Sequence, residues 1–153
     1  MSSEFERSVA PRGPARGRRK LLVVDDEPAV ARFLAHAADE CGWQASICLS
    51  ADAFRTEYES SAPDAVLLDL SLPGGDGIEL LKHLARRKAS ALIIVVSGLD
   101  HRILDAAMRL GLALGLDMGP PLTKPVMVRQ LAEALAHSDG GRKGTGNELC
   151  LGA

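Results

Sequence analysis

Three aspartates in the chain lie within or directly after uninterrupted apolar runs. Asp25 and Asp26 follow "LLVV" at residues 21–24, and Asp69 stands inside "AVLLDL" at residues 65–70. A carboxylate at such a place is costly to bury unless a cation or a hydrogen-bond donor compensates its charge. Clustered carboxylates repel one another, and an all-oxygen cluster is the kind of site that Mg²⁺ prefers. The pattern therefore predicts a site for a hard metal ion.

Two more polar residues follow apolar segments in the same way. Ser97 ends the run "ALIIVVS", and Lys124 follows the segment "DMGPPLT". Taken singly, each residue has a plain structural interpretation, as a turn serine or a surface lysine, just as the aspartate pair could cap a helix. Their recurrence at the ends of successive apolar segments favours one shared site.

The elements that must position these residues alternate along the chain. Short apolar runs predict strands at residues 21–24, 45–49, 65–70 and 91–97, with an irregular fifth at 117–123 because of its two prolines. Helical spacing predicts helices that cover residues 30–41, 54–58, 78–85, 103–115 and 128–135. We read Gly42 as the end of the first helix and Pro125 as a first-turn proline of the last.

This alternation predicts an α/β fold in which a doubly wound, five-stranded parallel sheet is flanked by five helices. In open parallel sheets, ligands bind beyond the carboxyl ends of the strands. The aspartates, the serine and the lysine should therefore meet at one edge of the sheet.

Composition limits the class of protein. The 153 residues are 46% hydrophobic and 25% charged, which suits one globular domain. No apolar stretch approaches the ~20 residues of a membrane span, and the Arg-rich beginning lacks the apolar run of a secretory signal. We expect a cytoplasmic protein without a membrane partner. The three cysteines show no metal-ligand spacing, so we expect reduced thiols.

Charge and glycine content divide the chain into three segments. The first 20 residues carry six basic and two acidic side chains, whereas the whole chain has a net charge of −2. We predict a disordered basic leader at 1–19, a folded domain at 20–137 and a flexible tail at 138–153. A run of arginines attracts phosphates whatever the base sequence, but the folded domain is acidic and we do not expect nucleic acid as a partner.

These motifs resemble those of the receiver domain of bacterial two-component response regulators, the CheY-like superfamily. "VVDDEP" resembles the acidic pair of that family, "LLDLSLPGGDGIEL" its phosphoacceptor segment, "VVSG" its hydroxyl position and "TKP" its lysine. The resemblance covers about residues 20–137. It implies a flavodoxin-like sheet with strand order 2-1-3-4-5.

The resemblance also implies roles for individual residues. Asp69 is the expected phosphoacceptor, with Ser97 and Lys124 completing the catalytic group. The implied Mg²⁺ ligands are Asp26, Asp69 and the backbone carbonyl of Ser71, with Asp25 acting mainly through water. The implied partners are a histidine kinase or histidine phosphotransfer protein as donor and a protein as downstream target, with the chain a monomer or weak dimer. Such a domain accepts a phosphoryl group and can release it to water, and is not a turnover enzyme.

Two features depart from the family pattern. Where most receivers carry an aromatic switch residue three positions before the lysine, this chain has Pro121. In addition, the helix "ILDAAMRLGLALG", ending near Gly115, is longer than usual and resembles the variant in receivers linked to cyclic-di-GMP phosphodiesterase outputs. We expect phosphorylation to be read through this helix, in which Gly111 lowers helical stability by about 1 kcal/mol relative to alanine.

Other functions stay open at this point. The chain could be a receiver-fold binding module that acts without phosphorylation, or the receiver part of a larger regulator whose output domain is missing. An aspartyl phosphatase is disfavoured, because that class needs a second acid two residues after the nucleophile and Ser71 occupies the position.

Overall fold

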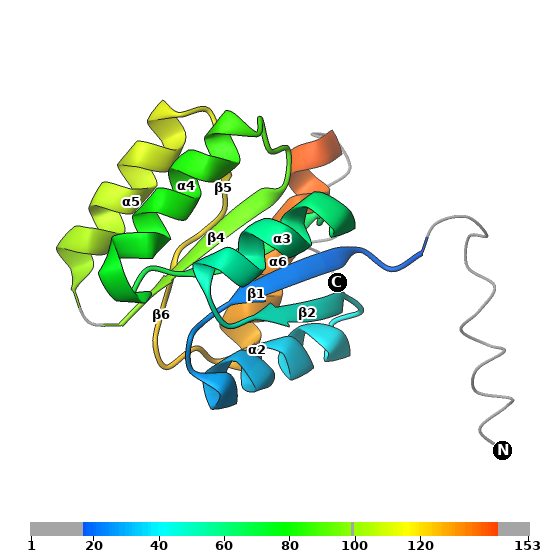
Figure 1. The fold of residues 1–153 in the computed structure, drawn as a ribbon. Coiled ribbons are helices and arrows are strands. Elements are labelled where there is room, and N and C mark those ends of the chain that lie inside the picture. The colour runs from blue at the N-terminus through cyan, green and yellow to red at the C-terminus, as the bar shows by residue number, and fades with distance from the viewer. Residues whose placement is uncertain (1–16, 99, 144–153) are drawn as a thin grey trace, which may run out of the picture.

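The apolar runs of the sequence form one parallel sheet. The structure, a computed structural model, describes residues 17–98 and 100–143. The strands are β1 (Lys20–Val24), β2 (Gln44–Cys48), β3 (Ala65–Asp69), β4 (Leu92–Ser97), β5 (Asp117–Met118) and β6 (Leu122–Thr123). They lie in the order β2-β1-β3-β4-β5, with β6 also paired to β4 (Figure 1). This order confirms the predicted doubly wound sheet.

The predicted fifth strand is divided into two short pieces. β5 pairs with the beginning of β4, and β6 pairs with its end, at Val96 and Ser97. Residues 119–121, Gly-Pro-Pro, separate the two pieces. Gly119 N–H still donates a hydrogen bond of 2.8 Å to the Ile93 carbonyl, and pairing stops after it because the two prolines have no backbone N–H to donate. The expectation of an irregular edge strand is confirmed, and β6 places the residue after it beside the end of β4.

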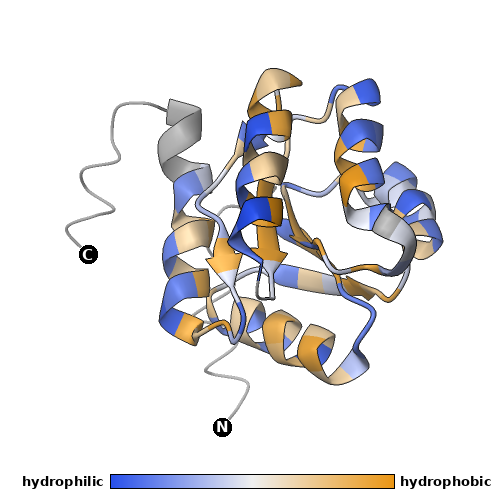
Figure 2. Ribbon diagram, turned by 90° about the vertical axis from the view of Figure 1, so that its left-hand side faces the viewer, coloured by the Kyte–Doolittle hydropathy of each residue, from blue (hydrophilic) through white to orange (hydrophobic). Residues whose placement is uncertain are grey.

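Within the part of the chain that the structure describes, five helices cover the two faces of the sheet. They are α2 (Pro28–Glu40), α3 (Ala51–Ser61), α4 (Asp76–Arg86), α5 (His101–Ala113) and α6 (Val128–Lys143), with a short 3-10 turn η1 (Pro73–Gly75) before α4. α2 and α6 pack on one face, and α3, α4 and α5 pack on the other (Figure 1). Figure 2 shows apolar strands between helices that carry hydrophilic residues. Within the described ranges, no helix is long and apolar enough to cross a bilayer.

The central strands are buried on both faces. Along β1, Leu21 and Val23 pack beneath α2 and α6, while Leu22 and Val24 pack beneath the other three helices. Each of these side chains is at most 1% exposed, and burial of one such side chain contributes about 1.5–3 kcal/mol. β3 and β4 are buried throughout in the same way. Because of this packing, β1, β3 and β4 hold the residues at their carboxyl ends in fixed positions.

The carboxyl ends of α2 and α5 agree with the prediction from the sequence, whereas both ends of α6 differ from it. α2 ends just before Gly42, which has a φ of +93°, and α5 ends just before Gly115, which has a φ of +85°. The interpretation of Pro125 as a first-turn proline is wrong, because α6 begins only at Val128 and Pro125 precedes it in a cis peptide bond with Lys124. α6 also continues to Lys143, into the segment assigned to the flexible tail.

The last residues of the predicted leader pack against the domain. Arg18 forms an ion pair with Asp39 at 2.8 Å, and the Arg19 guanidinium lies 4.5 Å from the centre of the Trp43 ring. Arg19 also donates a hydrogen bond to the hydroxyl of Ser138 on α6. Residues 1–16 of the leader and residues 144–153 of the tail lie outside the described residues. The exact domain boundaries stay a prediction.

Candidate functional site

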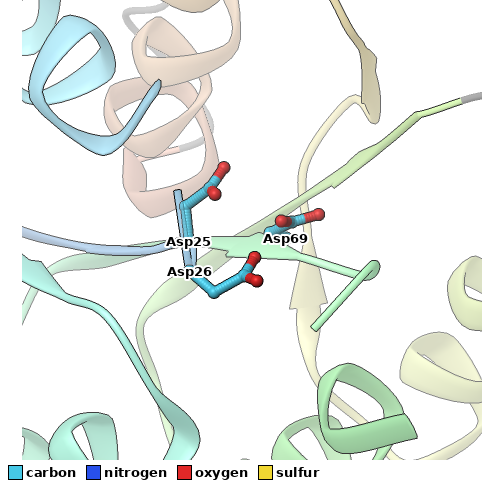
Figure 3. Close-up of side chains that lie close together, drawn as sticks. All are labelled: Asp25, Asp26 and Asp69. Atoms are coloured by element: carbon cyan, nitrogen blue, oxygen red, sulfur yellow. The ribbon is translucent and has the colours of Figure 1, made fainter. Parts of the chain in front are cut away.

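Three carboxylates meet at the carboxyl ends of β1 and β3. Asp25 and Asp26 directly follow β1, and Asp69 is the last residue of β3. One carboxylate oxygen from each lies within 4.8 Å of the other two (Figure 3). Asp25 and Asp69 are 1% and 2% exposed, whereas Asp26 is exposed. The predicted acidic cluster is therefore present, with one open side.

Lys124 bridges the two buried carboxylates. Its Nζ lies 3.0 Å from Asp25 Oδ2 and 3.2 Å from Asp69 Oδ2. The backbone brings it there, because Lys124 N–H donates a hydrogen bond of 2.8 Å to the carbonyl of Ser97, continuing the pairing of β6 with β4. The lysine compensates part of the acidic charge and ties the last strand to the site.

Burial and nearby charges of opposite sign shift the pKa values of Asp69 and Lys124 in opposite directions. Burial raises the pKa of Asp69, and the neighbouring Asp25 carboxylate raises it further, while the Ser71 N–H and the Lys124 ammonium lower it; the net direction is upward. Burial lowers the pKa of Lys124, but the carboxylates of Asp25 and Asp69 raise it more. One lysine therefore does not offset the cost of ionising Asp69 here, and an additional cation would favour the charged cluster.

Backbone N–H groups orient the buried carboxylates. Asp69 Oδ1 accepts a hydrogen bond of 2.9 Å from Ser71 N–H, and Asp25 Oδ1 accepts one of 2.9 Å from Glu27 N–H. The N-cap residue of α2 is Glu27, whose side chain makes no capping hydrogen bond. The structure thus gives neither Asp25 nor Asp26 the role of N-cap, and the acidic pair faces Asp69 and Lys124 instead.

Ser97 lines a cavity next to the phosphoacceptor candidate. It is 5% exposed at the end of β4, whose Val96 carbonyl accepts a hydrogen bond of 2.8 Å from Leu70 N–H. The cavity has a volume of about 340 Å³ and is lined by Leu70, Ser71, Ser97, Gly98, Asp100 and Ile103. Ser71 and Ser97 therefore share one space beside Asp69. Pro121, at the position of the usual aromatic, is exposed between β5 and β6.

An apolar groove, not predicted from the sequence, is lined by Lys124 together with residues of α2. It has a volume of about 600 Å³ and is lined by Ala29, Val30, Phe33, Leu34, Gly98, Lys124, Pro125 and Val126. The spacing of Val30, Phe33 and Leu34 indicates a core-facing stripe, yet the Phe33 side chain is 47% exposed. The feature of the sequence that could have indicated the groove was a large apolar residue, Phe33, beside the predicted site.

The cluster fits a magnesium ion. All candidate donors are oxygens, and Mg²⁺ takes oxygen ligands at about 2.0–2.1 Å, so two ligands on opposite sides lie about 4.2 Å apart. The three carboxylate oxygens lie within 4.8 Å of one another, which is compatible with this spacing. The exposed Asp26 leaves the cluster open to the waters that Mg²⁺ usually keeps.

Comparison with known proteins agrees with this geometry. Residues 21–136 match the family model described as the response regulator receiver domain. The chain belongs to this family. Receiver domains are phosphoacceptors of two-component systems, and membership implies a cognate kinase. The acidic triad of this chain is typical of the receiver Mg²⁺ site.

Curated relatives of the receiver are longer than this chain. It is 36% identical over 111 residues to the sensory transduction protein RegX3 of Mycobacterium tuberculosis, which covers 72% of this chain and 46% of the relative. It is 32% identical over 113 residues to the alkaline phosphatase synthesis transcriptional regulatory protein PhoP of Bacillus subtilis, with 74% and 45% covered. The chain thus spans less than half the length of these relatives.

Solved structures match nearly the whole of the described domain. A response regulator from Colwellia psychrerythraea has a TM-score of 0.71 and 29% identity, covering 80% of this chain and 98% of that chain. A CheY-like receiver domain protein from Methanospirillum hungatei has a TM-score of 0.72 with 84% and 99% covered; at 24% identity it supports the fold alone.

Proposed function

We propose that this receiver domain is phosphorylated on Asp69 by a histidine kinase or a histidine phosphotransfer protein and signals through contacts with a downstream protein. The observation that carries the proposal is the setting of Asp69, a buried carboxylate that pairs with Lys124 and directly precedes Leu70 and Ser71, which line one cavity with Ser97. The family supports the donor class, and we place the protein in the cytoplasm on the same ground.

The residues suit the chemistry of phosphoryl transfer. A carboxylate oxygen of Asp69 forms a bond to phosphorus while the phosphorus–nitrogen bond of the donor phosphohistidine breaks, giving an acyl phosphate. The transition state spreads negative charge over the phosphoryl oxygens. The Lys124 ammonium stabilises that charge, and the Ser97 hydroxyl donates a hydrogen bond to the transferred group.

The acidic cluster gives the metal its proposed role. Asp26, Asp69 and the backbone carbonyl of Ser71 would hold Mg²⁺, with Asp25 acting mainly through water. When bound, Mg²⁺ supplies positive charge for the phosphoryl oxygens. The open side at Asp26 also admits water, so hydrolysis of the acyl phosphate can limit the lifetime of the signal.

The test of this proposal uses acetyl phosphate, a small donor that needs no partner protein. In Mg²⁺ the wild type should gain the mass of one phosphoryl group, and in excess EDTA it should gain almost none. The reason is that Lys124 alone cannot offset three clustered carboxylates and an incoming dianion. Mass spectrometry of the intact protein measures both arms. Equal uptake without the metal would refute the metal site, and no uptake in either arm would favour a binding module that acts without phosphorylation.

We propose the apolar groove as the docking site of the donor protein, because one of the residues that line it is Lys124, which contacts Asp69. Phe33 is its exposed aromatic, and such residues dominate interface energetics. Phe33→Ser should slow transfer from the phosphorylated cognate kinase about tenfold, corresponding to a loss of about 1.4 kcal/mol, while labelling by acetyl phosphate is unchanged. Leu112→Ser, which changes an exposed leucine on α5, is the matched control. Equal kinase rates for both variants would exclude the groove.

The readout of phosphorylation should involve α5. Ile103 in its first turn lines the cavity that contains Ser97, so movement of the serine toward a phosphoryl group reaches this helix directly. Pro121 has a fixed φ and no side chain that can swing inward. Hydrogen exchange with and without beryllofluoride should therefore change mainly at residues 98–115. Changes confined to residues 117–137 would contradict this route.

A further inference from the structure

Gly77 packs directly against the backbone of the phosphoacceptor segment. It is the second residue of α4 and is buried. A Cβ atom at this position would lie 2.9 Å from the Cα of Leu70, 3.1 Å from the carbonyl oxygen of Asp69 and 3.2 Å from the carbonyl carbon of Leu70. All three are backbone atoms, so a change of rotamer cannot relieve the contact.

The segment that would have to move is held on its other side. Leu70 N–H donates a hydrogen bond of 2.8 Å to the Val96 carbonyl on β4, and Ser71 N–H donates one of 2.9 Å to Asp69 Oδ1. A methyl group at residue 77 would press the Asp69–Leu70 peptide away from α4. Because Ser71 N–H is bonded to the Asp69 carboxylate, that displacement would reach the carboxylate and the Ser71 backbone together.

We infer that Gly77 is a positioning residue, whose missing side chain sets the Asp69 carboxylate and the Ser71 carbonyl at the distances that Mg²⁺ and the phosphoryl group require. The inference rests on the proposed function. Mg²⁺ demands near-ideal octahedral geometry, so a shift of a few tenths of an ångström in two ligands weakens its binding. Groups that orient metal ligands typically change metal affinity by about 10–100-fold when altered.

The test compares Gly77→Ala with Gly111→Ala. Gly111 is also a buried helical glycine, and its Cβ would meet the flexible Met118 side chain on β5 rather than the phosphoacceptor segment. Titration calorimetry should show Mg²⁺ affinity at least about tenfold lower in Gly77→Ala and within about twofold of wild type in Gly111→Ala. Labelling by acetyl phosphate at subsaturating Mg²⁺ should follow the same order.

The outcomes separate this inference from the proposed function. Wild-type affinity and labelling in a folded Gly77→Ala protein would overturn the inference alone, whereas absence of labelling in the wild type would overturn the proposed function. If Gly77→Ala does not fold, Mg²⁺ titration of the wild type by NMR decides instead. The amide signals of Leu70 and Gly77 should shift with the same affinity as that of Asp69, and unmoved signals would overturn the inference.

Discussion

Asp69→Asn should take up no phosphoryl group from acetyl phosphate under conditions that label the wild type to one group per chain. An amide oxygen is a far weaker nucleophile than a carboxylate, and the substitution removes one proposed metal ligand as well. Asp105→Asn, an exposed aspartate on α5, is the matched control and should be labelled like the wild type. Mass spectrometry of the intact proteins is sufficient to measure this uptake. Uptake that persists in Asp69→Asn would place the acceptor elsewhere.

The same variant should be more stable than the wild type in metal-free buffer at neutral pH. The pKa of Asp69 is raised in the folded state, chiefly by burial. A raised carboxyl pKa means that the folded state favours the protonated form, so the associated stability is present at low pH and is lost as the pH rises through the folded-state pKa. An uncharged asparagine side chain at this position avoids the loss, and Lys124 keeps its ion pair with Asp25. A lower melting temperature of Asp69→Asn would show that the Asp69 side chain mainly stabilises the loop that follows β3.

Asp26→Asn should also melt at a higher temperature than the wild type without metal, and it should respond less to Mg²⁺. Removing one of three carboxylates within 4.8 Å relieves repulsion, by about 1 kcal/mol for an exposed group at high effective dielectric. At a concentration of 100 Kd, Mg²⁺ stabilises the wild type by about 2.7 kcal/mol, and a tenfold weaker variant gains only about 1.4 kcal/mol. Thermal melts with and without Mg²⁺ measure both effects.

The direction in which Asp26→Asn changes the melting temperature without metal distinguishes two roles for Asp26. If Asp26→Asn melts at a lower temperature than the wild type, the side chain supports the turn between β1 and α2, and that support outweighs the repulsion. Asp105→Asn again serves as the control, because it removes one exposed acid outside the cluster. Its metal-free melting temperature and its Mg²⁺ response should both match the wild type.

The sheet and the acidic cluster could be predicted because both depend on local patterns. Uninterrupted apolar runs identify β1, β3 and β4, and parallel pairing brings their carboxyl ends to one edge. Asp25, Asp26 and Asp69 therefore meet wherever such a sheet forms. The break in the last strand was predictable too, since two consecutive prolines remove ladder donors.

Other features depend on tertiary contacts that spacing does not encode. The double ion pair of Lys124 requires the path of β6 along the end of β4. The start of α6 was misplaced because a proline at N1 and a proline before the helix give the same local signal. The closeness of Gly77 to the Asp69–Leu70 peptide follows from how α4 packs. Phe33 lines the groove, and helical spacing alone does not tell a buried face from a groove wall.

The most direct test of the central claim is to locate the phosphoryl group in the wild-type protein. After labelling with acetyl phosphate and Mg²⁺, borohydride reduction converts an aspartyl phosphate to homoserine, which peptide mass spectrometry can assign to one residue. Phosphorylation of Asp69 predicts homoserine at residue 69 and an unmodified aspartate at residues 25 and 26. Homoserine at another position, with Asp69 intact, would contradict it.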